Sequence, residues 1–159
     1  MSEVISSCCF SGHRELPEAK LGYICGMLEA CIDKLAEEGC EEFVSGGALG
    51  FDLLAAEAVL KKKKAYPKIR LVMALPCRNQ HEKWSAFQKT RYERILEQAD
   101  EIVYLCESYV TGCMQLRNKY MVDRCDFCVA FLSHGGGTQH TVNYATEKGK
   151  RVVNLAQKL

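Results

Sequence analysis

Residues 42–52 read EFVSGGALGFD, and this stretch joins a short apolar run to a helical pattern through three glycines. The run from Glu42 to Ser45 has the length of a short buried strand, and Phe51 to Lys64 carries apolar residues at helical spacing. A strand that passes through a glycine-rich turn directly into a helix is the repeating unit of an α/β fold. The turn also leaves unpaired N–H groups at the start of the helix, which suits a phosphate.

Outward from this stretch, strand and helix alternate along the whole chain. Further strands are predicted for residues 4–10, 69–75, 101–105, 126–132 and 151–155. Further helices are predicted for residues 17–38, 82–98, 113–124 and 138–148. Such alternation produces a parallel sheet with helices on both faces. The sequence therefore predicts a single domain, residues 1–159, with an α/β fold: a Rossmann-like three-layer sandwich with a mostly parallel sheet of about six strands.

Composition and charge narrow the classes of function. The 159 residues include 21 basic and 20 acidic side chains, which gives a net charge of +1. Because nucleic-acid-binding proteins usually present excess positive charge, nucleic acid is not the expected partner. No stretch approaches the ~18–20 consecutive apolar residues of a membrane span. The first ten residues lack the basic segment of a signal peptide. We therefore expect a cytoplasmic protein with no membrane partner.

Ten cysteines are scattered along the chain. Most fall within apolar strand or helix patterns, where a free thiol packs as a small hydrophobic group, and disulfides are rare in the cytoplasm. Cys125 and Cys128 have the spacing of metal ligands, but neither a second such pair nor paired histidines follow. Side chains three residues apart on a strand also point to opposite faces. We therefore expect no bound metal.

Polar or glycine-rich segments follow three of the predicted strands: Ser11-Gly12-His13-Arg14, the stretch 45–52, and Ser133-His134-Gly135-Gly136-Gly137-Thr138. Ligands of open α/β sheets bind beyond the carboxyl ends of the strands, where these segments meet. The glycines either permit tight turns and nothing more or form a cradle for a phosphorylated ligand, and two such loops on one sheet favour the cradle. This hypothesis assigns ligand contacts to the loop residues Ser11, Gly12, Gly46, Gly47, Gly50, Gly135, Gly136, Gly137 and Thr138.

Five charged or polar side chains complete the candidate site. Arg14 either forms two parallel hydrogen bonds to a phosphate or carboxylate, or lies on the solvated surface. Asp52 would repel a phosphate, so it either accepts hydrogen bonds from ribose hydroxyls or caps the helix that begins there. Arg117, Asn118 and Asp123 lie on a predicted helix that is too polar for full burial. They either point into the cleft or cover an ordinary amphipathic surface.

Together these segments resemble the YpsA-like branch of the SLOG superfamily, whose relatives include the DprA DNA-processing proteins and the LOG cytokinin-activating enzymes. The resemblance covers nearly the whole chain. Its motifs are Ser11-Gly12-His13-Arg14, Ser45-Gly46-Gly47-x-x-Gly50-x-Asp52, the stretch Pro76…Gln80…Trp84, Arg117-Asn118-x-x-Met121-x-Asp123, and Gly136-Gly137-Thr138. It implies a Rossmann-like fold, binding of nucleotides or nucleotide-derived signals, and a homodimer.

The resemblance also bears on catalysis. LOG enzymes carry Pro-Gly-Gly-x-Gly-Thr-x-x-Glu, and the glutamate serves the hydrolysis. Aligned on Gly135-x-Gly137-Thr138, this chain has Thr141 at that position, and threonine cannot act as a carboxylate base. The favoured hypothesis is a module that binds or senses a nucleotide-like ligand, with no catalytic residue and no certain cofactor assigned. The alternatives are a hydrolase of an N-glycosidic or phosphate bond in such a ligand, and a nucleic-acid-binding relative.

Overall fold

The computed structural model describes residues 4–159; residues 1–3 of the predicted domain lie outside the described part. In chain order the elements are β1 (Ser7–Gly12), η1 (Glu18–Lys20), α1 (Leu21–Glu37), β2 (Glu42–Ser45), α2 (Phe51–Lys62), β3 (Arg70–Leu75), α3 (Ala86–Gln98), β4 (Glu101–Tyr104), α4 (Cys113–Arg124), β5 (Phe127–Phe131), α5 (Gly137–Glu147), β6 (Arg151–Asn154) and η2 (Leu155–Lys158). The alternation confirms the predicted α/β class.

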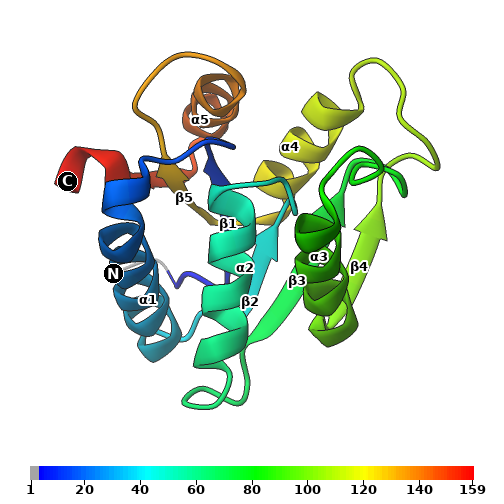
Figure 1. Ribbon diagram of the computed structural model, residues 1–159. Coiled ribbons are helices and arrows are strands. Elements are labelled where there is room, and N and C mark those ends of the chain that lie inside the picture. The colour runs from blue at the N-terminus through cyan, green and yellow to red at the C-terminus, as the bar shows by residue number, and fades with distance from the viewer. Residues whose placement is uncertain (1–3) are drawn as a thin grey trace.

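The six strands form one sheet in the order β4-β3-β2-β1-β5-β6, and every neighbouring pair is parallel. Helices α1, α2 and α3 lie in front of the sheet in Figure 1, and α4 and α5 lie behind it. The predicted three-layer sandwich is therefore confirmed. From β1 the chain continues toward β2, whereas from β5 it continues toward β6 on the other side. The junction of β1 and β5 is thus the topological switch point, where open α/β sheets bind ligands.

The two faces of the sheet carry side chains of different size. Facing α1, α2 and α3, the strands contribute large residues such as Phe10, Phe43 and Phe131 to one buried cluster. Facing α4 and α5, they contribute small residues such as Cys9 and Ala130 to a second cluster. Successive strand residues point to opposite faces, so the alternation of larger and smaller side chains along β2, β3 and β5 produces this asymmetry. The small face lets the polar helix α4 pack close to the sheet.

An ion-pair network at the amino end of the sheet holds α4 in place. Arg124, the last residue of α4, donates to Glu42 at 2.7 Å and to Glu101 at 2.9 Å. These carboxylates begin strands β2 and β4, which lie on either side of β3. The hydrogen bonds from Arg124 hold the pKa of Glu101 below its usual value. One guanidinium therefore joins the end of α4 to two strands at their amino ends. The carboxyl ends, where ligands of such sheets bind, lie on the opposite side of the sheet.

The structure corrects several predicted boundaries. Helix α1 begins at Leu21 rather than at residue 17, after the short helix η1. Strand β1 runs from Ser7 to Gly12 rather than from residue 4 to 10, because backbone pairing with β5 continues to Gly12 opposite Phe131. Helix α3 begins at Ala86 rather than at residue 82. A capping box fixes this start: the hydroxyl of Ser85 accepts from the N–H of Gln88 at 3.2 Å, and the side chain of Gln88 accepts from the N–H of Ser85 at 3.0 Å. The signal Ser-x-x-Gln was present in the sequence.

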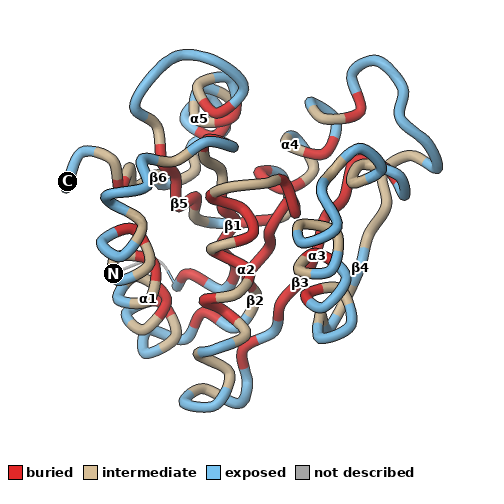
Figure 2. Tube along the Cα trace, in the orientation of Figure 1, coloured by how far each residue is buried: buried red, intermediate tan, exposed pale blue. Residues whose placement is uncertain are grey.

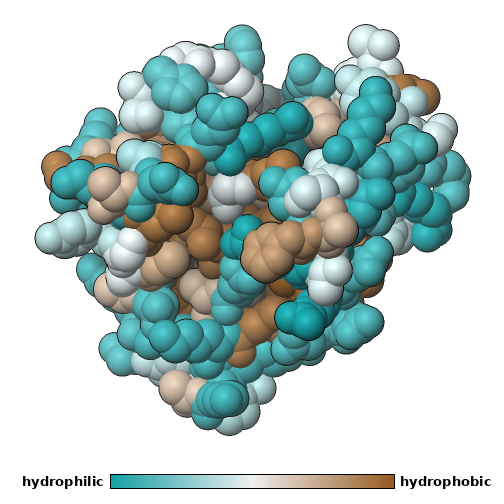
Figure 3. Space-filling view, in the orientation of Figure 1, coloured by the Kyte–Doolittle hydropathy of each residue, from teal (hydrophilic) through white to brown (hydrophobic). Residues whose placement is uncertain are grey.

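Burial follows the layers. Buried residues concentrate in the strands and on the inner sides of α1 and α2, and exposed residues follow the outer turns and the loops (Figure 2). From the side of α1, α2 and α3 the surface is mostly hydrophilic, with hydrophobic residues showing between α1 and α2 (Figure 3). Within residues 4–159, no helix has both the length and the apolar character needed to cross a membrane.

Candidate functional site

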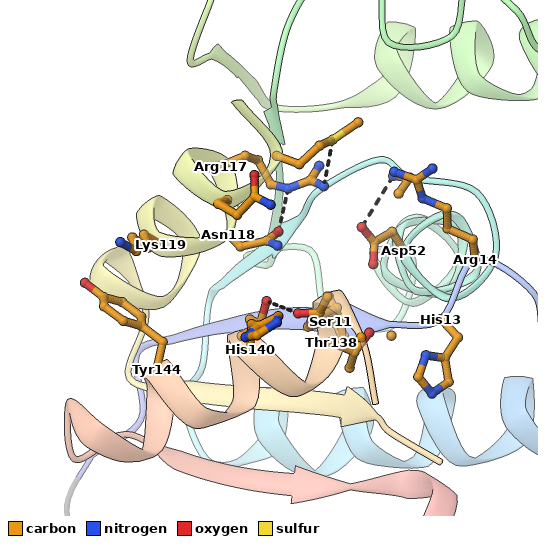
Figure 4. Close-up of a pocket in the computed structure, with 18 of the residues that line it drawn as sticks. Ser11, His13, Arg14, Asp52, Arg117, Asn118, Lys119, Thr138, His140 and Tyr144 are labelled. Atoms are coloured by element: carbon orange, nitrogen blue, oxygen red, sulfur yellow. Dashed lines mark hydrogen bonds between the residues drawn. The ribbon is translucent and has the colours of Figure 1, made fainter. Parts of the chain in front are cut away.

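A cavity of about 450 Å³ opens at the carboxyl edge of the sheet, at the switch point between β1 and β5. Its walls come from the end of β1 and the segment after it, the start of α2, the first half of α4, the β5–α5 loop and one side of α5 (Figure 4). The cavity residues are Phe10 to Arg14, Ala48, Asp52, Met114, Gln115, Arg117 to Lys119, His134 to Thr138, His140, Thr141 and Tyr144. Such a volume suits a ligand of the size of a mononucleotide.

The glycines of the first two segments serve contacts between the segments themselves. Gly50 has a φ of 81°, and a Cβ at this position would lie 2.3 Å from the carbonyl oxygen of Arg14. A Cβ at Gly12 would lie 2.4 Å from the ring of Phe51, whose backbone N–H donates to the carbonyl of His13 at 3.1 Å. The segment after β1 and the start of α2 are therefore in direct contact, and glycine is required on both sides.

A buried arginine holds the β2–α2 loop to α4. Arg117 is only 4% exposed, and its guanidinium donates to the carbonyl of Gly46 and, at 2.8 Å, to the side chain of Asn118. A Cβ at Gly46 would lie 2.6 Å from Arg117 Nη1, so only glycine leaves room for the guanidinium. Burial lowers the pKa of Arg117, and the nearby carboxylate of Asp52 opposes that shift. Much of the hydrogen-bonding capacity of Arg117 is therefore used within the protein.

Asp52 is a buried carboxyl group in the cavity wall. Its Oδ2 accepts from the backbone N–H of Ala48 at 3.3 Å, and it lies in the first turn of α2, whose N-cap is Gly50. Asp52 therefore braces the loop ahead of the helix and is not the N-cap residue. Burial raises the pKa of Asp52 to about 6, against the opposing effects of Arg117, the Ala48 N–H and Arg14. Figure 4 shows the side chain of Arg14 extending toward Asp52.

The third segment, Gly135 to Gly137, is built differently. All three glycines are exposed, and a Cβ at any of them would meet nothing within 4 Å. Gly136 is the N-cap of α5, so the first N–H groups of that helix point out of the helix end without helical partners. Thr138 lies beside Ser11 at the cavity, in the first turn of α5 (Figure 4). This open turn combines the positive end of a helix dipole with free donors.

Two stacked histidines connect this open turn to the end of β1. The ring of His13 lies against that of His134, with centroids 3.7 Å apart and planes 7° from parallel. The Nε2 of His13 accepts a hydrogen bond from the backbone N–H of Ser133 at 3.0 Å. Because Nε2 accepts, this geometry requires the neutral imidazole with its proton on Nδ1. Burial and the neighbouring His134 lower the pKa of His13 from 6.5.

The structure brings ten of the fourteen predicted ligand-contact residues to the cavity wall: Ser11, Gly12, Arg14, Asp52, Arg117, Asn118, Gly135, Gly136, Gly137 and Thr138. It places the other four elsewhere. Gly46 and Gly50 support the packing described above, and Gly47 packs on Leu75 and Gln80. Asp123 is exposed outside the cavity and accepts from the hydroxyl of Tyr144 at 2.7 Å. It lies six residues beyond Arg117, on another face of α4.

Sequence reasoning missed several cavity residues on the two rear helices. On α5 these are His140, Thr141 and Tyr144, and on α4 they are Met114, Gln115 and Lys119. A signal for them existed, because residues three or four apart on a helix share a face. Counting forward from Gly137 by helical spacing reaches 140, 141 and 144. Lys119 and Tyr144 also approach each other, with the ammonium 5.7 Å from the ring centre.

The cysteine pair behaves differently from the prediction. Cys125 and Cys128 belong to the same buried cluster, together with Cys9, and do not point to opposite faces. Cys125 precedes strand β5 as the C-cap of α4, so strand alternation does not apply to it. Contacts with these two thiols and burial raise the pKa of Cys9 well above its usual value. Within residues 4–159, no group of three or more metal-ligating side chains has an arrangement that could hold an ion.

The sequence model of the YpsA family, described as the YspA SLOG family, matches residues 12–155. The chain belongs to this family. An uncharacterised prophage-derived protein of Bacillus subtilis, YoqJ, is 36% identical over an alignment of 132 positions that covers 74% of this chain and 77% of YoqJ. A UPF0398 protein of Halalkalibacterium halodurans is 38% identical over 106 residues, 65% of this chain and 56% of that protein. The match thus spans little more than half the length of the second relative.

A solved structure shares the fold. DNA processing protein A from Helicobacter pylori, described by its single-stranded DNA binding mode, superposes with a TM-score of 0.66. The likeness covers 92% of this chain and 63% of the other, at 22% sequence identity. The likeness confirms the Rossmann-like architecture that the sequence predicts for this chain.

Proposed function

We propose that this SLOG protein binds a phosphorylated, nucleotide-like ligand in the cavity, with its phosphate at the N-terminus of α5. One observation carries this proposal: the turn from Gly135 to Thr138 is part of the cavity wall, and its three glycines are exposed with nothing within 4 Å of a Cβ. A helix N-terminus supplies both unpaired N–H donors and a positive potential. A Cβ at these glycines would meet nothing within 4 Å, so packing does not require glycine here, although the φ of 142° at Gly136 does. At Gly135 and Gly137 the missing side chain leaves the backbone accessible.

The charges of the cavity support an anionic ligand. Arg14 and Lys119 contribute positive charge from two different walls, and neither is paired with a carboxylate in the ion pairs of the described residues. Arg117 is also cationic but is committed to Gly46 and Asn118. Asp52 is the carboxylate of the cavity wall, on the α2 side rather than at the α5 turn. The phosphate therefore has a favourable end, away from Asp52.

Asp52 fits the other part of such a ligand. Its Oδ2 is occupied by the Ala48 N–H, while the carboxyl group as a whole faces the cavity. A carboxylate is an acceptor only, so it suits the hydroxyls of a ribose rather than a phosphate. We infer that Asp52 reads the sugar. In that case Asp52→Asn weakens binding of ribonucleotides more than of their 2′- and 3′-deoxy analogues, as measured by titration calorimetry. An equal loss for both classes of ligand contradicts the ribose role.

The phosphate site is tested by Gly137→Asp. An aspartate in the first turn of α5 leaves stability unchanged or raises it by a few tenths of a kcal/mol, because it complements the helix dipole. It also repels a phosphate at the same place, so we expect at least a tenfold loss of affinity. The matched control is Gly137→Asn, which has the same shape without the charge and keeps most of the affinity. The ligand is found first by a thermal-shift screen of mononucleotides, dinucleotides and ADP-ribose.

A ligand at about 100 times its dissociation constant adds ~2.7 kcal/mol to the free energy of unfolding. Two further assays separate the alternatives. Release of free base, ribose phosphate or inorganic phosphate supports the hydrolase. A salt-dependent gel shift with single-stranded DNA supports the nucleic-acid-binding relative. If no nucleotide stabilises the wild-type protein and Gly137→Asp changes nothing, the proposed site is wrong. The homodimer stays a prediction, which sedimentation equilibrium tests.

A further inference from the structure

His13 connects the segment after β1 to the β5–α5 loop. His13 is buried in the cavity wall and accepts the N–H of Ser133 at 3.0 Å. Its ring stacks on His134 at 3.7 Å and meets the edge of Phe131. The loop that these contacts hold continues directly into Gly135, where a Cβ would meet nothing within 4 Å. The contacts of His13 with Ser133 and His134 therefore fix the position of the chain just before the open turn.

We propose that His13 is a positioning residue for the anion site, and that it holds the Gly135–Thr138 turn in its binding geometry only while its imidazole is neutral. The inference rests on the proposed phosphate site. Protonation of Nε2 would place an N–H against the N–H of Ser133, so the hydrogen bond would be lost. It would also put a cation 3.7 Å from the ring of His134. Both changes separate the end of β1 from the loop that carries the phosphate donors.

Few titratable groups of the cavity lie next to His13. The titratable group that faces it is His134, on the β5–α5 loop, and this is the charge that shifts its pKa besides burial. The other ionisable groups of the cavity wall are Arg14, Asp52, Arg117, Lys119, His140 and Tyr144. Burial and the neighbouring His134 both disfavour the protonated ring of His13. The change in loop geometry therefore sets in below pH 6.5.

The inference reverses the ordinary expectation for an anion site. Protonating histidines near a bound anion normally strengthens binding, because positive charge is added. Here protonation of His13 removes the geometry of the site, so acidification weakens binding. The apparent dissociation constant equals the intrinsic one divided by the fraction of molecules with neutral His13, so a half-protonated population doubles the apparent constant. Sulfate is the suitable probe, because its charge does not change between pH 5 and pH 8 as that of phosphate does.

Two measurements on the full chain test the proposal. In the first, NMR follows the backbone amides of Ser133 and of Gly135 to Gly137 from pH 8 to pH 5 without ligand. We expect one shared midpoint below pH 6.5 in the wild type. In the second, sulfate titrations at pH 7.5 and pH 5 use the shifts of the same amides. We expect the dissociation constant to rise toward pH 5, reaching about twice its value at pH 7.5 at the midpoint of the ligand-free titration.

Three variants decide what causes the pH dependence. His13→Gln keeps an acceptor for Ser133 but cannot titrate, so it binds sulfate at pH 7.5 and loses the acid effect. His13→Phe keeps a planar ring against His134 without an acceptor. At every pH it therefore binds sulfate about fivefold more weakly than the wild type does at pH 7.5, the equivalent of one hydrogen bond. His140→Gln removes another histidine of the same cavity, and its pH profile keeps the sign of the wild type.

The outcomes separate the two proposals. Tighter sulfate binding at pH 5 in the wild type overturns the role of His13, as does an unchanged acid effect in His13→Gln. Equal binding by His13→Phe and the wild type at pH 7.5 overturns it as well. If sulfate binds at no pH, the proposed phosphate site fails. The ligand-free titration then still decides whether His13 positions the loop: a shared midpoint that disappears in His13→Gln supports it, and independent midpoints contradict it.

Discussion

Two loops of this protein are rich in glycine, yet they use the residue for opposite purposes. In the β2–α2 loop the glycines are crowded: Gly46 faces the guanidinium of Arg117, and Gly50 lies against the backbone after β1. In the β5–α5 loop, from Gly135 to Gly137, a Cβ would meet nothing within 4 Å. The first loop needs glycine because neighbouring groups fill the space. The second has the space, and glycine leaves its backbone accessible, although the φ of 142° at Gly136 also requires glycine at that position.

Glycine-rich turns after parallel strands are therefore not equivalent indicators of ligand binding. In a crowded loop, the protein's own backbone and side chains occupy the space beside the glycines. In an open loop, that space is accessible to another molecule. The comparison leads to a graded series of glycine-to-alanine variants, in which the effect on stability falls from the crowded loop to the open one.

The largest effect is expected for Gly50→Ala. The new Cβ would lie 2.3 Å from the carbonyl oxygen of Arg14 and 2.5 Å from that of His13, and the backbone φ of 81° is itself unfavourable for alanine. Backbone atoms cannot move aside as a side chain does. We expect a loss of roughly 3 kcal/mol or more in the free energy of unfolding, measured by urea denaturation. A loss under 1 kcal/mol would show that the contact between the two segments is loose.

A smaller effect is expected for Gly47→Ala in the same loop. Gly47 also has a positive φ, 69°, but its Cβ would first meet the end of the Leu75 side chain at 2.7 Å. That methyl group can shift, so the remaining cost is mainly the left-handed backbone, about 1–2 kcal/mol. The same urea titrations measure it. A cost equal to that of Gly50→Ala would mean that the whole loop is rigid, rather than the part beside His13.

The smallest effect on stability is expected for Gly135→Ala. Nothing lies within 4 Å of the new Cβ, and Gly135 is not among the residues with positive φ. The free energy of unfolding should change by less than ~0.5 kcal/mol. Any effect on binding of the ligand identified in the nucleotide screen then belongs to the site and not to folding. If Gly135→Ala destabilises the protein as much as Gly47→Ala, the two loops do not differ as described.

The fold was predictable because it rests on local periodicity. The alternation of buried strands and helices appears in the sequence and leads directly to a parallel sheet between helices. The end of β1 was misplaced because Ser11 and Gly12 are not apolar, although their backbones pair with β5. Strand ends are fixed by hydrogen bonds to a partner, and a single sequence does not show which partner that is.

The site was predictable only in part, for a related reason. Whether a glycine is crowded depends on residues that are distant in the sequence. Gly46 is crowded by Arg117, which donates to its carbonyl across 71 positions of the chain. No pattern within the β2–α2 loop records that contact. The errors at Asp123 and Tyr144 have another cause. Helical spacing within α4 and α5 is visible in the sequence, and it separates the side chains that face the cavity from those that do not.

The position of the cavity has a consequence for how the chain is completed during synthesis. The hydrogen bond between Ser133 and His13 joins residues 120 positions apart, and β1 has its second neighbour only when β5 is present. A growing chain that ends before residue 127 can pair β1 with β2, yet it leaves the other edge of β1 unpaired and has no binding site. Contacts over such separations form slowly. The cavity therefore lies at the pairing of β1 with β5, which forms after that of β1 with β2. Ligand binding is thus a measure of whether this second pairing has formed.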